Sequence, residues 1–194
     1  MAERADAARN REAILGAAQR LLRERDLDDI CMDDVAAAAG VGKGTVFRRF
    51  GDREGLVEAV VNHVGAGWRE QAERILADAE LSAVERVITF VERLFEHILE
   101  TLPLVRAFEQ VSERFRCGDG LEPIRQGLVA SIAEARPEGD AEFRAESLLA
   151  VLRGQHVHYL LRQRGMSVDQ VRAGVIGLAW DLVGDRRGAT MPAL

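Results

Sequence analysis

The 194-residue sequence is poor in aromatic residues and in stretches where apolar and polar residues alternate. Phe, Trp and Tyr make up 5% of the chain, and its apolar residues are mostly Ala, Leu and Val at helical spacing. A strand-rich fold needs alternating runs, so we expect an all-α protein. Hydrophobic residues make up 47% of the chain, which is enough to bury a core in one or two domains.

The sequence also lacks the cysteine patterns and apolar runs of secreted or membrane proteins. Cys31 and Cys117 form neither a CxxC pair nor a disulfide framework. No N-terminal apolar segment has the length of a signal peptide or a membrane span. We therefore expect a cytoplasmic protein with no membrane partner.

Patterns that carry catalysis or bind metals are missing as well. No HExxH, G-x-S-x-G or P-loop motif occurs. His156 and His158 are two positions apart on an expected helix, so they point roughly 200° apart and cannot share a metal ion. His63 and His97 have no neighbours at ligand spacing. We expect no enzymatic activity, no metal site and no cofactor.

Positive charge is concentrated in one short run, although the whole chain has a net charge of −6. Residues 41–53 contain four cationic side chains and only one carboxylate, while residues 56–194 have an excess of acidic side chains. An acidic total argues against diffuse nucleic-acid binding. A single basic face can nevertheless bind phosphates.

The basic run lies within a pattern of three helices. Apolar spacing predicts a helix over residues 10–25, a short helix over 32–39 that ends at a glycine, and a third helix that begins near Lys43. Val46 and Phe50 lie one turn apart and can be buried together, which leaves the cations nearer the solvent. This arrangement predicts a helix-turn-helix, although a solvated basic face on an ordinary helical hairpin would give the same pattern.

Two stretches, "REAILGAAQRLL" and "DDVAAAAGVGKGTVFRRFGDREGL", resemble the DNA-binding region of the TetR family of bacterial transcriptional regulators. The similarity covers about residues 10–60 in both order and spacing. It implies a second helix that enters the major groove of double-stranded operator DNA, with a pseudo-palindromic operator for a homodimer. The candidate DNA-binding residues are Lys43, Gly44, Thr45, Phe47, Arg48, Arg49 and Arg53.

Several of these residues have a physical role that suits DNA. Thr45 lies near a helix start, where its hydroxyl can bind a phosphate or a base edge, and Gly44 permits close approach. Arginine suits bidentate contact with guanine, which favours Arg48 or Arg49. Arg53 resembles the basic residue that opens the family's fourth helix and binds the DNA backbone. The alternative for Arg53 is an ion pair with the adjacent carboxylate of Asp52 or Glu54.

Three departures from the family's pattern affect the backbone contacts. Phe47 replaces the usual tyrosine and has no hydroxyl to donate. Gly42 replaces a common serine cap. Asp33 and Asp34 begin the second helix, where they suit the helix dipole but would repel phosphate. The departures predict weaker phosphate contacts within the same fold.

We expect about nine helices in two domains. Residues 1–55 would form the DNA-binding domain, with 1–9 as a flexible arm. Residues 56–194 would form an effector-binding and dimerisation domain, with 185–194 as a flexible tail. In this larger domain, helices are predicted over about 52–79, 82–101 with a stop at Pro103, 104–115, 121–135, 141–163 and 168–183.

The last predicted helix has apolar residues on two faces, so one face can pack on its own domain and the other on a second copy. This is similar to the family's four-helix dimer interface, and burial wholly within one chain is the alternative. The candidate interface residues are Gly154, Gly174, Val175, Gly177, Leu178 and Leu182.

The family resemblance further implies a small-molecule effector, of unknown identity, that is apolar or amphipathic. Candidate ligand-binding residues are Trp68, Phe90, Phe95, His97, Phe108, His156 and Tyr159, although such aromatic residues also suit a core. The expected function is a ligand-responsive regulator, a repressor that the effector releases from its operator. The alternatives are a regulator without a ligand and a helical protein–protein interaction module without specific DNA binding.

Overall fold

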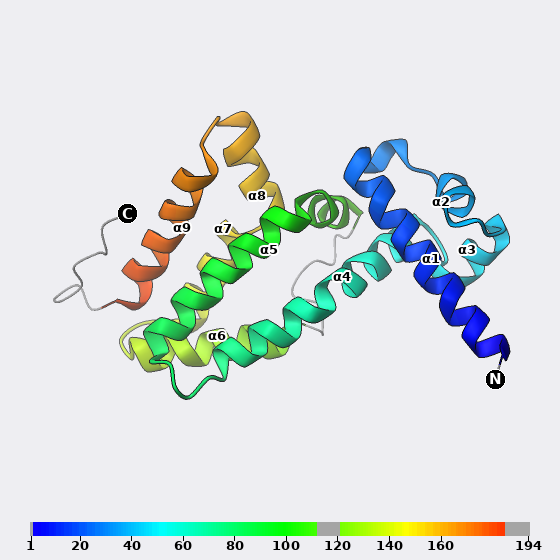
Figure 1. Ribbon diagram of the computed structural model, residues 1–194. Coiled ribbons are helices and arrows are strands. Elements are labelled where there is room, and N and C mark those ends of the chain that lie inside the picture. Colours follow the sequence, from blue (N-terminus) through cyan, green and yellow to red (C-terminus); the bar gives the residue numbers. More distant parts are fainter. Residues whose placement is uncertain (1, 112–120, 185–194) are drawn as a thin grey trace. The chain divides into compact units, whose positions relative to one another are not determined.

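The computed structural model describes residues 2–111 and 121–184, with side chains described over 6–107 and 121–184. Within these ranges the chain forms nine α-helices and no strand, which confirms the all-α fold (Figure 1). The elements are α1 (Ala2–Glu24), a 3-10 turn η1 (Leu27–Asp29), α2 (Met32–Ala39), α3 (Lys43–Phe50), α4 (Arg53–Leu76), α5 (Ala83–Val111), α6 (Glu122–Ala135), α7 (Ala141–Val151), α8 (Gly154–His158), a π-helical turn η2 (Tyr159–Gln163) and α9 (Val168–Val183).

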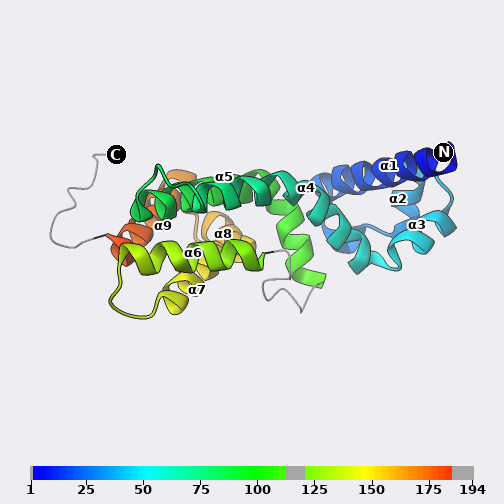
Figure 2. The ribbon, with the colours of Figure 1, turned by 90° about the horizontal axis from the view of Figure 1, so that it is seen from below.

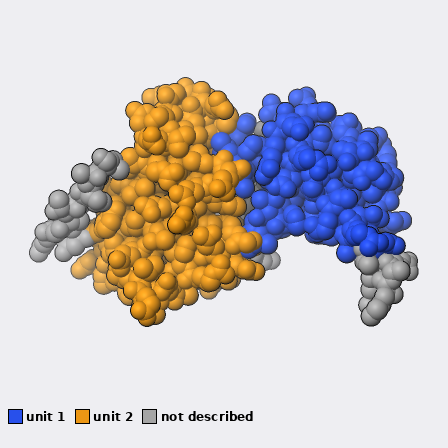
Figure 3. Space-filling model, viewed as in Figure 1, with its two compact units in different colours: residues 1–66, 101–115 blue, residues 67–100, 116–194 orange. Residues whose placement is uncertain are grey.

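The helices form two compact units, which Figure 3 shows in different colours. Unit 1 comprises residues 1–66 and 101–115, and unit 2 comprises residues 67–100 and 116–194. The boundary expected after residue 55 therefore differs from the observed division. Both α4 and α5 contribute residues to each unit.

The core of unit 1 explains why it extends beyond the first three helices. Apolar side chains of α1 and α2 pack with Val46 of α3, and Val57 and Val60 of α4 are buried in the same cluster. Leu104 and Ala107, from the end of α5, belong to this cluster as well. These apolar residues are shielded from solvent because they pack together. The core of unit 1 therefore includes the end of α5, although that segment is distant from the first four helices in the sequence.

Two expectations near helix ends are wrong. Helix α1 begins at Ala2, whereas the sequence predicts a helix that begins at about residue 10. Pro103 lies inside α5 and does not end it. Proline removes one helical hydrogen bond, but the burial of Leu104 and Ala107 stabilises the turn that follows. The expected tail, residues 185–194, lies outside the described residues, as does Cys117.

In unit 2, α6 packs beside α7 and α9 (Figure 2). The single helix expected over residues 141–163 is interrupted. Arg153 adopts an extended conformation with ψ 136° just before the buried Gly154, so α7 and α8 are separate. The Arg164 N–H then donates to the Tyr159 carbonyl, five residues back, which closes the π-helical turn. Over the described ranges, no helix is both long enough and apolar enough to span a membrane.

Candidate nucleic-acid interface

Helices α2 and α3 are joined by a short turn whose shape depends on glycine. Gly40 has φ 67°, in the left-handed region, and ends α2. The Val41 N–H donates to the Ala36 carbonyl at 3.0 Å, which closes the last turn. Gly42 is the N-cap of α3 and offers no side-chain acceptor. The structure therefore contains the helix-turn-helix that the sequence predicts.

A second turn connects α3 to α4. The Asp52 carboxylate accepts a hydrogen bond from the Gly55 N–H at 2.8 Å, which caps the first turn of α4. A Cβ atom on Gly55 would lie 2.2 Å from the Phe50 carbonyl oxygen, so only glycine fits there. These contacts set the direction in which α4 leaves the helix-turn-helix.

Helix α3 has one buried face and one solvent face. Val46 is buried and anchors the helix in the core of unit 1, while Phe50 is partly buried. Phe47 is 40% exposed, so its ring lies at the surface. Lys43, Gly44, Arg48 and Arg49 are exposed, Thr45 is partly exposed, and Arg53 is exposed at the start of α4.

Arg48 and Arg49 are the cations of α3 that are free to bind an external anion. Within the described residues, neither side chain forms a hydrogen bond or an ion pair. Both guanidinium groups can therefore reach a phosphate or a guanine edge without first leaving an intramolecular partner.

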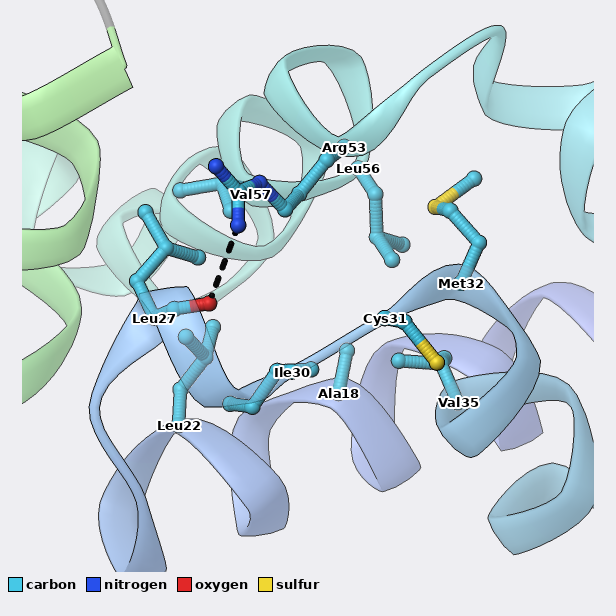
Figure 4. A pocket seen from close by; sticks show the side chains of 10 residues that line it. All are labelled: Ala18, Leu22, Leu27, Ile30, Cys31, Met32, Val35, Arg53, Leu56 and Val57. Atoms are coloured by element: carbon cyan, nitrogen blue, oxygen red, sulfur yellow. Dashed lines mark hydrogen bonds between the residues drawn. The ribbon is translucent and has the colours of Figure 1, made fainter.

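The two flanking cations have partners within unit 1. Lys43 Nζ lies 2.8 Å from the Asp33 carboxylate of α2. Arg53 donates to the Leu27 carbonyl at 3.2 Å, across a shallow hollow with apolar walls (Figure 4). Its second terminal nitrogen lies 3.8 Å from Asp28. The expected alternative, pairing with an adjacent carboxylate, is therefore wrong, because the partners precede Arg53 by about 25 residues.

The two acidic residues at the start of α2 have different roles. Asp34 accepts hydrogen bonds at 3.0 Å from the Cys31 backbone N–H and from the Cys31 thiol. These bonds, the backbone one first, hold the pKa of Asp34 below its usual value. Asp34 thus caps the helix, whereas Asp33 contacts α3. The sequence pattern alone treats the two carboxylates as equivalent.

The aromatic residues predicted to bind a ligand fall into two groups in unit 2. Trp68 and His97 are partly buried and stack with ring centroids 5.3 Å apart, and the Phe90 ring lies 6.0 Å from Trp68. Burial lowers the pKa of His97, although nearby Glu100 opposes this shift. Phe95 is fully buried in the core.

The second group lies at the surface. His156 and Tyr159 are exposed and stack on each other with centroids 6.3 Å apart. The side chain of Phe108 lies outside the described residues. Trp68, Phe90 and His97 therefore form the cluster that the structure brings together from the predicted set.

The predicted interface residues of α9 lie on different sides of the helix. Val175 is buried in its own unit, as is Gly154 of α8. A Cβ atom on Gly174 or Gly177 would meet no atom within 4 Å, so these glycines border open space. Leu178 and Leu182 are partly exposed.

Comparisons with known proteins agree with this geometry. The family model described as bacterial regulatory proteins, tetR family, matches residues 14–60. The chain is 28% identical over 188 residues to the HTH-type transcriptional repressor BepR of Brucella suis biovar 1. The alignment covers 85% of this chain and 87% of that protein. The matched segment of the family model runs from α1 to α4 and includes the whole helix-turn-helix.

Solved structures share the fold over most of the chain. A TetR/AcrR family regulator from Thermobifida fusca has a TM-score of 0.68 at 24% identity, covering 91% of this chain and 98% of that one. The fatty acid degradation regulator FadR from Bacillus halodurans has a TM-score of 0.66 at 16% identity, covering 92% and 97%. Residues 14–60, which contain the helix-turn-helix, are thus similar to the tetR family of bacterial regulatory proteins, and the chain has the fold of the solved TetR/AcrR regulator.

Proposed function

We propose that the chain is a homodimeric transcriptional repressor that binds a pseudo-palindromic operator through α3 and that a small apolar or amphipathic molecule releases it. The observation that carries the DNA-binding part is the solvent face of α3. There, two unpartnered arginines stand beside exposed Gly44 and partly exposed Thr45, on a helix anchored by Val46. An interaction module without specific DNA binding is not favoured, because such a module has no need of free cations on this helix.

A dimer is needed because a single short recognition helix covers too few base pairs for useful specificity. The open face of α9 around Gly174 and Gly177 is suited to close approach of a second copy. On the opposite face, Val171, Val175, Ala179 and Val183 pack into the chain's own core.

The effector would bind at the cluster of Trp68, His97 and Phe90. The partly buried Trp68 ring offers a flat apolar surface, the buried Phe90 ring lies beside it, and the His97 imidazole supplies a polar group, which is the composition typical of small-molecule sites. FadR of Bacillus halodurans is named as a regulator of fatty acid degradation, and an amphipathic effector of that kind is compatible with this cluster.

Selection of bound duplexes from a random pool by the full chain tests DNA binding. Arg48→Ala or Arg49→Ala should cost about 1–3 kcal/mol of binding to the selected operator if the guanidinium contacts a guanine. Arg164→Ala removes a charge from an exposed position of unit 2 and should leave binding unchanged. Failure of the wild type to enrich any sequence would refute the proposal.

Tryptophan fluorescence tests the effector site, because the chain has only two tryptophans, Trp68 and Trp180. A compound that releases the operator should change the emission of Trp180→Phe, which retains Trp68. The same compound should leave the emission of Trp68→Phe unchanged. A signal that survives only in Trp68→Phe would place the ligand elsewhere.

A further inference from the structure

The cation that opens α3 is already bound to a carboxylate. Lys43 Nζ lies 2.8 Å from each oxygen of Asp33, a residue ten positions earlier in the first turn of α2. Its ammonium group also lies 5.6 Å from the centroid of the Phe47 ring. Both members of the ion pair are largely exposed, so the pair sits at the surface that α2 and α3 present to solvent.

The helix cap does not account for Asp33. Asp34 performs the capping of α2 through its two hydrogen bonds with Cys31. Asp33 also suits the dipole at the helix start, a purely structural role that Asp34 shares. The distinctive contact of Asp33 is therefore the one with Lys43.

This contact matters for a protein that binds DNA. In helix-turn-helix complexes the first helix crosses the DNA backbone while the second enters the groove, so the start of α2 faces phosphates. A carboxylate there competes with phosphate for Lys43 and also repels phosphate directly. By contrast, over the described residues, the side chains of Arg48 and Arg49 have no carboxylate partner to leave before they bind a phosphate.

We propose that Asp33 is a positioning residue that holds Lys43 in the free protein and thereby lowers the affinity of the chain for every duplex. Phosphate contacts carry no sequence information, so the effect is the same on operator and non-operator DNA. Discrimination between sequences then depends on Arg48 and Arg49. This inference rests on the proposed DNA-binding function. Arg53, with its partners Leu27 and Asp28, shows a weaker form of the same arrangement.

The test compares Asp33→Asn with Asp29→Asn over a series of salt concentrations. Asp29 is exposed, lies in η1 close by in sequence, and makes no ion pair within the described residues, so its variant removes the same charge. Asp33→Asn should bind operator and scrambled duplexes about threefold to tenfold more tightly, and Asp29→Asn should change binding by less than about twofold.

The salt dependence separates this role from a structural one. Freeing Lys43 should steepen the slope of log K against log salt by about 0.9 for each subunit. Asp33→Glu, which keeps the carboxylate, should restore the wild-type slope. In a Lys43→Ala background, Asp33→Asn should have a smaller effect than in the wild type.

Equal behaviour of Asp33→Asn and Asp29→Asn on an operator that the wild type binds would overturn the role of Asp33 and leave the proposed function intact. An unchanged salt slope would overturn it too. Absence of any DNA binding by the wild type would instead refute the proposed function. Circular dichroism of each variant checks that α2 is still folded.

Discussion

The arginines that connect helices of unit 2 and the arginines of α3 are used in opposite ways. In unit 2, Arg86 donates to the Asp78 and Leu81 carbonyls and pairs with Glu134 of α6. Arg172 of α9 pairs with Glu96 of α5 at 3.2 Å. On α3, neither arginine has a partner within the described part of the chain.

Arg125 forms further ion pairs in unit 2. Arg125 donates to Glu122 within α6 and to Glu142 of α7. Hydrogen bonds from Arg125 and Gln126 lower the pKa of Glu122 to about 2. Cations that connect helices contribute to the fold, whereas cations without partners are available to an external anion. The paired or unpaired state of an arginine therefore distinguishes the helix-connecting arginines of unit 2 from the two arginines of α3.

The largest effect should come from placing an unpaired cation inside unit 2. Val175 is 6% exposed, so Val175→Arg buries a charge without a partner and should cost more than about 3 kcal/mol of folding stability. Gly177→Arg puts the same charge on the open face of α9 and should stay folded but become monomeric. Urea denaturation and light scattering measure the two outcomes. A dimeric Gly177→Arg protein would place the interface on another surface.

Removing a paired arginine should also affect stability more than removing a free one. The Arg86 side chain is 11% exposed, and Arg86→Ala leaves carbonyl groups without donors, so it should cost about 1–3 kcal/mol. Arg48→Ala should change stability by less than about 0.5 kcal/mol while it weakens operator binding. Urea titrations of both variants make the comparison. Equal losses of stability would show that Arg48 has a structural contact as well.

A smaller change should come from adding a donor beside the free arginines. Phe47→Tyr places a hydroxyl on an exposed ring of α3 and should strengthen DNA binding by roughly 0.5–1.5 kcal/mol through a phosphate contact. The gain should be similar on operator and scrambled duplexes, since phosphates carry no sequence information. Titrations at one fixed salt concentration check this. Unchanged or weaker binding would mean that the ring does not face the DNA backbone.

The smallest expected effect is a pH dependence from His97. Burial holds the pKa of His97 in the folded chain below 6.5, the ordinary value that applies to the unfolded chain. At a pH between the folded and the unfolded pKa, the unfolded chain therefore binds a proton that the folded chain does not. The free energy of unfolding should therefore be unaffected by His97 above pH 6.5 and should fall as the pH decreases below it. His97→Gln should show a shallower decline. Identical pH profiles of the two proteins would exclude this contribution.

Local patterns predicted several elements closely. The apolar spacing and the glycine after Ala39 predicted α2 with its observed bounds, and the apolar spacing over residues 168–183 predicted α9. Such signals act within a few residues, so they can be read without knowledge of the fold. The helix-turn-helix and its exposed cations were predictable for the same reason.

Other features depended on distant residues. Pro103 was expected to end a helix, but packing of Leu104 and Ala107 into unit 1 carries α5 past it. Trp68 and His97 lie on two different helices, and the sequence, which offers seven candidate ligand residues, does not indicate that these two rings stack. The sequence likewise did not separate Val175, which faces the core, from Gly177, which faces open space.

The helical class, the helix-turn-helix and the concentration of positive charge on α3 all follow from local spacing, composition and turn chemistry, so they can be predicted from the amino-acid sequence. Which of those charges are free depends on contacts between residues that are distant in the sequence. Asp33 reaches Lys43 across the turn between α2 and α3, and the Leu27 carbonyl of η1 accepts a hydrogen bond from Arg53 at the start of α4. Ion pairs between helices form where packing brings side chains within a few ångströms, and packing is set by the burial of apolar residues along the whole chain.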